Sequence, residues 1–103
     1  MGYFLLQPLF PLGDLLCSFG VTALGIDLTS YIWRHQTGDW GDLSSEDLED
    51  NRLAVTSNDA ILSKYHLTTP DGISETICLM TEKDRPYTVI FILGEALDMP
   101  PGE

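Results

Sequence analysis

The apolar residues follow two different spacings, one before and one after residue 59. Between residues 24 and 32 they recur every three to four positions, which predicts a helix that begins near Asp27 and ends at Gly38. Ser44 is typical of a helix N-cap, so a second helix is expected over residues 45–56, with acidic residues in its first turn.

After residue 59 apolar and polar side chains alternate, which is typical of half-exposed strands. Three strands are expected, "AILSKYHLT", "ETICLMT" and "YTVIFILG", joined by turns at "TPDG" and "EKDRP". The third strand is apolar on both faces from residue 89 to 93, so it is predicted to lie in the interior of the sheet.

The first part of the chain is apolar but carries Pro8 and Pro11, which favours an edge strand or an irregular covering segment. Gly20 to Gly25 indicates a short helical turn. We expect one domain, 1–103, with an extended segment (1–19), a helical part (20–57), a β-meander (60–93) and a frayed tail (94–103). The predicted fold class is α+β, with two N-terminal helices packed on a three- to four-stranded antiparallel sheet.

The charge balance disfavours some classes of function for this protein. Sixteen acidic residues stand against five basic ones, giving a formal net charge of −11. Such a charge repels nucleic-acid phosphates and anionic membranes and attracts basic proteins, so we expect neither direct nucleic acid binding nor membrane attachment. The start of the chain lacks the basic region of a signal peptide. Cys17 and Cys78 each lie among apolar neighbours, which favours buried, reduced thiols and a cytoplasmic protein.

The most unusual stretch is "GDWGDLSSEDLEDN", residues 38–51. It carries six carboxylates with no Lys or Arg among them: Asp39, Asp42, Glu46, Asp47, Glu49 and Asp50. On a helix, Glu46, Glu49 and Asp50 share a face at a spacing of about 5–6 Å. A row of carboxylates at this spacing can stand in for a row of phosphates in a basic groove. We therefore predict that the six residues bind a partner; a solvated face that only aids solubility is the alternative.

Metal and catalytic chemistry have less support. The carboxylates lack the spacing of a calcium loop, and the two His and two Cys lack zinc-site spacing. Ser63 and His66 should point to opposite faces of their strand, and Cys78 could meet His66 only across neighbouring strands. We expect no metal, no cofactor and no enzymatic activity.

Three further residues have structural interpretations. His35 should lie in the last turn of the first helix, where positive charge suits the helix dipole. Trp40 should fill the core and fix the loop between the helices. Arg85 should pair with Glu82 or another carboxylate near its turn.

Three blocks of the sequence resemble a family of small "plasmid-related proteins" of bacterial plasmids and other mobile elements. The blocks are "RHQTGDWGDLSSEDLEDN", "ILSKYHL" and "LMTEKDRPYTVIFIL", at residues 34–51, 61–67 and 79–93. The family strand that reads "WIITE" is "CLMTE" here. The resemblance implies a mobile-element origin, where small proteins often counter host defence, but it brings no established activity.

Charge and resemblance together predict a non-enzymatic acidic inhibitor. We expect it to bind a basic nucleic-acid-binding protein, either a CRISPR effector or a restriction enzyme, and so to act as an anti-CRISPR or anti-restriction protein. The alternative is a small regulatory or antitoxin-like module, or a homo-oligomeric protein. A homodimer is compatible with the apolar third strand.

Overall fold

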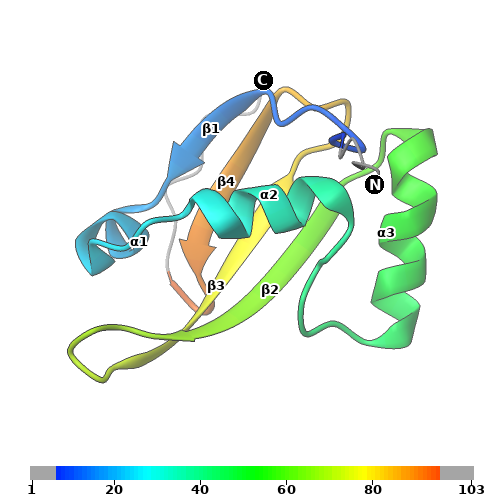
Figure 1. Ribbon diagram of the computed structural model, residues 1–103. Coiled ribbons are helices and arrows are strands. Elements are labelled where there is room, and N and C mark those ends of the chain that lie inside the picture. The colour runs from blue at the N-terminus through cyan, green and yellow to red at the C-terminus, as the bar shows by residue number, and fades with distance from the viewer. Residues whose placement is uncertain (1–6, 96–103) are drawn as a thin grey trace, which may run out of the picture.

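A four-stranded mixed sheet organises the described part of the protein (Figure 1). The computed structural model describes residues 7–95. The elements within this range are β1 (Asp14–Cys17), α1 (Phe19–Leu24), α2 (Thr29–Thr37), α3 (Ser45–Ser57), β2 (Ile61–Thr68), β3 (Ser74–Thr81) and β4 (Tyr87–Ile92). The strand order is β1-β4-β3-β2, so β4 lies in the interior as its sequence predicts.

Two turns fix the antiparallel meander of β2, β3 and β4. In the first, the Gly72 N–H donates to the Thr69 carbonyl and the Thr69 N–H donates to the Ile73 carbonyl, both at 2.8 Å. In the second, Asp84 and Arg85 adopt positive φ angles of 65° and 66°. Both turns were expected, and short turns of this kind make the strands they join antiparallel.

The expectation of a fully antiparallel sheet is wrong, because β1 pairs with β4 in parallel. Leu15 lies opposite Thr88, and Cys17 lies opposite Ile90. A hairpin dictates the direction of β3 and β4, but no short turn joins β1 to its neighbour, so the sequence held no signal for its direction. The thiol of Cys78 is buried as expected, whereas Cys17 is exposed because β1 forms an edge of the sheet.

The expectation of two helices is also wrong, since the described residues contain three. The short turn expected from Gly20 to Gly25 is a helix of six residues, α1, which contains Gly20 and ends before Gly25. The Ser18 hydroxyl accepts a hydrogen bond from the Val21 N–H and donates one to Glu95, whose carboxylate also accepts from the Gly20 N–H. Glu95 thereby joins the end of β4 to the start of α1. No helix within residues 7–95 has the length and apolar character needed to span a membrane.

The main core lies between one face of the sheet and the first two helices. Its buried members are Val21, Tyr65, Ile77, Leu79 and Ile90, with apolar side chains of α2 packed against them. Figure 1 shows α2 lying across the front of the sheet, with α3 standing beside β2. A second cluster, formed by Phe10, Trp40, Ala54 and Ile61, joins α3 to the sheet.

Part of the sequence-based expectation lies outside the described residues. This applies to residues 1–6 of the extended N-terminal segment and to residues 96–103 of the tail.

Shortening a side chain at the centre of β4 should strongly destabilise the fold. Ile90 is fully buried, so Ile90→Ala removes apolar contacts and leaves a cavity that should cost about 2–5 kcal/mol of unfolding free energy. Urea denaturation monitored by tryptophan fluorescence measures this loss. Leu93→Ala is the control, because Leu93 is 55% exposed and should lose far less. Equal losses from both variants would contradict an interior position for β4.

Candidate functional site

The six carboxylates of residues 39–50 divide into two groups. Asp39 and Asp42 lie in the loop between α2 and α3. The other four lie on α3 and are here called the acidic face of α3: Glu46, Asp47, Glu49 and Asp50. All six were predicted to form one surface, but the two groups have different surroundings.

Local sequence fixes both ends of α3, as predicted. The Ser44 hydroxyl accepts a hydrogen bond from the Asp47 N–H at 3.0 Å. At the other end Asn58 adopts a left-handed conformation and donates its N–H to the Ala54 carbonyl at 3.0 Å. Only Asn51 and Ala54 of this helix are buried, so most of its surface faces solvent.

Hydrogen bonds to backbone atoms hold α3 in place. The Asn51 side chain donates to the Leu62 carbonyl at 2.7 Å and accepts from the Leu62 N–H at 3.2 Å. Arg85 donates to the carbonyls of Ala54 and Asp59 at 2.7 and 2.6 Å. The expected pairing of Arg85 with a carboxylate is therefore wrong. Its guanidinium lies at the C-terminal end of α3, where helix carbonyls lack intrahelical donors.

The outward side of α3 combines negative charge with one apolar residue. At 3.6 residues per turn, Glu46, Glu49 and Asp50 fall within an arc of about 100°. Leu53 lies in the same arc and is 55% exposed. Glu49 forms an ion pair with Arg52. Among the described residues, no cationic side chain pairs with Glu46 or Asp50.

Asp39 and Asp42 are engaged within the protein. Arg34 donates to both carboxylate oxygens of Asp39, at 2.7 and 3.3 Å, and this hydrogen bonding lowers the pKa of Asp39. The Oδ2 atom of Asp42 lies 2.7 Å from Nε2 of His66, a hydrogen bond that lowers the pKa of Asp42. These two carboxylates are therefore less available to a partner than those of α3.

The loop that carries Asp42 runs along the outer edge of β2. The Lys64 N–H donates to the Trp40 carbonyl at 3.0 Å, and the Asp42 N–H donates to the Lys64 carbonyl at 2.8 Å. Gly41 has a φ of 81°, and a Cβ there would lie 2.0 Å from the Lys64 carbonyl oxygen, so a side chain cannot be accommodated. Trp40 is 7% exposed and donates to the His35 carbonyl, which confirms its expected core position.

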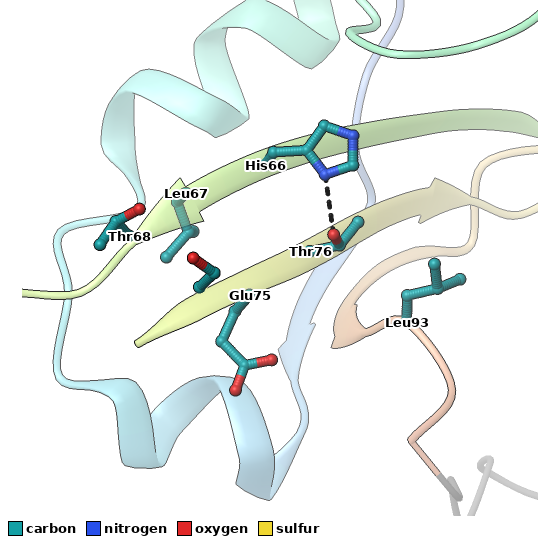
Figure 2. A pocket seen from close by; sticks show the side chains of 7 residues that line it. His66, Leu67, Thr68, Glu75, Thr76 and Leu93 are labelled. Carbon is teal, nitrogen blue, oxygen red and sulfur yellow. Dashed lines mark hydrogen bonds between the residues drawn. The ribbon is translucent and has the colours of Figure 1, made fainter. Parts of the chain in front are cut away.

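His66 lies where two open hollows meet, of about 510 and 390 Å³. Figure 2 shows its ring above Thr76, with Nδ1 2.8 Å from the Thr76 hydroxyl. Asp42, His66 and Thr76 thus form a carboxylate–imidazole–hydroxyl chain. No sequence pattern indicated this series of hydrogen bonds, because the three residues come from three different elements.

The exposure of these side chains limits the chemistry that the hydrogen-bonded series can perform. The side chains of His66 and Asp42 are 59% and 66% exposed, so water competes for both. Activation of a hydroxyl by an imidazole is most effective in a site from which water is excluded. The hydrogen bonds of Asp42, His66 and Thr76 instead hold the loop between α2 and α3 against the sheet.

A second imidazole is fully buried. His35 Nδ1 lies 2.5 Å from the Ser63 hydroxyl, and Nε2 lies 2.9 Å from the Thr81 hydroxyl. The Thr81 and Thr88 hydroxyls are 2.7 Å apart, and Thr88 donates to the Leu12 carbonyl. These hydrogen bonds join α2 to β2, β3 and β4 and to the segment before β1.

Burial determines the charge of His35. Desolvation and, to a smaller extent, the nearby positive charge of Arg85 together lower its pKa from 6.5 to about 4. The expectation that His35 adds positive charge to the helix end is therefore wrong. Ser63 and His66 do point to opposite faces as expected, and Ser63 instead pairs with His35 in the sealed interior.

Metal-binding chemistry has no obvious location in this part of the chain. Residues 7–95 contain no group of three or more His, Cys, Asp or Glu side chains placed to hold a metal ion. His35 and His66 both spend their ring nitrogens on hydrogen bonds to side chains.

His35 should make the protein less stable in mildly acidic solution. The unfolded chain takes up a proton near pH 6.5, whereas folded His35 does so only near pH 4. The unfolded state binds more protons between these values, so stability should fall by about 3 kcal/mol as pH drops through this window. Urea denaturation at pH 7 and pH 4.5 measures the change.

Two variants isolate the contribution of His35. His35→Gln should be less stable at pH 7 but should lose less stability on acidification, because glutamine does not titrate. His66→Gln is the control that removes the exposed imidazole, and it should still lose more stability on acidification than His35→Gln. A wild-type stability that stays constant over this pH range would contradict the assigned state of His35.

Comparison with known proteins adds nothing to this geometry. No family model, curated protein or solved structure matches the chain.

Proposed function

We propose that the protein is a non-enzymatic inhibitor that binds a basic, nucleic-acid-binding protein through the acidic face of α3. The observation that carries the proposal is the exposure of Glu46 and Asp50 without a cationic partner in the described residues. No cationic side chain of residues 7–95 therefore competes with an incoming partner for these two carboxylates. The net charge of −11 adds a long-range attraction that accelerates association with a basic surface.

The geometry of α3 supports competition with nucleic acid. Carboxylates three or four positions apart on a helix are about 5–6 Å apart. Successive phosphates of a nucleic acid strand are separated by a similar distance, since each nucleotide advances about 3.4 Å along the axis while the backbone winds around it. A groove lined with Lys and Arg can therefore accept the acidic face of α3 in place of a phosphate backbone.

Leu53 supports a protein partner over simple counterion binding. It lies among the carboxylates and is 55% exposed, so it can enter an apolar recess of the partner surface. Protein interfaces commonly combine an apolar centre with a polar rim, and the apolar centre contributes most of the affinity.

The resemblance to plasmid-related proteins suggests the class of target. A mobile element gains from blocking the nucleases that would destroy its DNA. The proposed targets are therefore a CRISPR effector or a restriction enzyme of the host, both of which hold nucleic acid in basic channels.

Neutralising the unpaired carboxylates should weaken target binding. Glu46→Gln with Asp50→Asn preserves size and hydrogen bonding but removes two charges, which should weaken binding by about tenfold, mainly through slower association. The assay measures displacement of labelled nucleic acid from purified host restriction enzymes and CRISPR effectors by fluorescence anisotropy. Wild-type displacement should decline as salt increases, and less steeply for the variant.

The matched control carries Asp71→Asn with Glu75→Gln, which lie away from α3 and remove the same charge. This control should bind almost as well as the wild type. Equal losses from both variants would mean that total charge matters and that α3 has no special role. Failure to displace nucleic acid from any enzyme of the panel would contradict the proposed function.

A further inference from the structure

The two outer edges of the sheet differ in how their backbone groups are satisfied. Along β2, the chain itself occupies the edge at Leu62 and Lys64, through Asn51 and the loop before α3. The rest of that edge, at His66 and Thr68, is flanked by polar side chains. Polar side chains of this kind discourage pairing with another strand.

The edge formed by β1 is different. Asp14 and Ser18 donate their N–H groups to β4, at the Pro86 and Ile90 carbonyls. Because alternate residues of a strand direct their backbone groups to opposite sides, the N–H and C=O groups of Leu15 and Cys17 point away from the sheet. Neither residue hydrogen-bonds another described residue through these groups.

Apolar side chains surround this open edge. Leu15 is 43% exposed and Phe19, the first residue of α1, is 94% exposed. The four residues of β1, "DLLC", contain no Lys or Pro, the residues with which proteins commonly protect an edge strand. An open hydrogen-bonding edge beside exposed apolar side chains is suited to another β-strand.

We propose that β1 pairs antiparallel with β1 of a second copy of this chain, forming a two-fold symmetric dimer with one continuous sheet. The strand is self-complementary when the symmetry axis passes through Leu16. Leu15 of each copy then faces Cys17 of the other, and the outward backbone groups form four hydrogen bonds. This inference does not depend on the proposed function.

The position of the acidic face of α3 leaves this edge accessible to a second copy. Figure 1 shows β1 and α3 on opposite sides of the molecule. In the dimer, six strands would lie between the two β2 strands, which places the acidic faces of α3 more than about 30 Å apart. This distance exceeds the Debye length of about 8–10 Å at moderate salt, so repulsion between these faces is screened.

The first test is the oligomeric state of the purified full-length protein, measured by sedimentation velocity over a wide range of protein concentration. A concentration-dependent dimer is expected, and salt should strengthen it by screening the net charge of −11 on each copy. A strict monomer at high concentration and high salt would overturn the proposal. Assemblies that grow beyond a dimer would also overturn it, because they indicate head-to-tail pairing of β1 with β2.

Two variants test the edge itself. Cys17→Pro removes an N–H that points away from β4, so the sheet keeps its internal hydrogen bonds while the dimer loses two. Its dimer dissociation constant should rise by roughly 30-fold. Leu15→Lys should weaken the dimer as well, and circular dichroism checks that both variants fold. Folded variants that dimerise as well as the wild type would place the interface elsewhere and refute the proposal.

A crosslink tests the register. Residues at position 16 would face each other in a non-hydrogen-bonded pair, with Cα atoms about 4.5 Å apart, within the range of a disulfide. Leu16→Cys combined with Cys17→Ser should therefore form a covalent dimer on mild oxidation. The control, Leu53→Cys in the same background, carries a more exposed thiol on α3 and should not form one. A dimeric protein in which position 16 does not crosslink would overturn the assigned register.

Discussion

The buried imidazole of His35 is the point at which the helices and the sheet are joined. Its two ring nitrogens contact hydroxyls of β2 and β3, and its backbone carbonyl receives the Trp40 side chain. The position of α2, the path of the following loop and the start of α3 all depend on this contact. A neutral imidazole suits the role, because it can donate through one nitrogen and accept through the other.

The loop between α2 and α3 leads from this interior contact to the outer surface of the protein. In the interior, the Trp40 side chain holds the loop through its hydrogen bond to α2. At the edge of β2, Gly41 lies against Lys64. At the surface, Arg34 and His66 pair with Asp39 and Asp42, respectively. Two of the six carboxylates thus serve the loop, whereas the four of the acidic face of α3 are exposed to solvent.

Local chemistry made much of the fold predictable. The cap at Ser44, the glycine after α2, the turns between the strands and the interior position of β4 all follow from side-chain chemistry over a few residues. The parallel pairing of β1 did not follow, since it depends on contacts with a strand about 70 positions away. The pairs His35–Ser63 and Asp42–His66 were missed for the same reason.

The three sequence blocks at residues 34–51, 61–67 and 79–93 contain both residues that serve the interior and residues that face solvent. Some of them, including His35, Trp40 and Arg85, serve the interior or the attachment of α3. Their presence in these blocks is thus explained by folding alone. The acidic residues are the part of the first block that contributes least to the interior.

The attachment of α3 has a consequence for how this protein can change over generations. Asn51 and Arg85 hold the helix largely through main-chain atoms, and only Asn51 and Ala54 of the helix are buried. Substitutions on its outward side therefore leave the scaffold intact, so new recognition properties can be acquired one residue at a time without refolding. The helix is in this respect comparable to a variable loop on a constant framework, and it offers a starting point for libraries selected for binding to basic proteins.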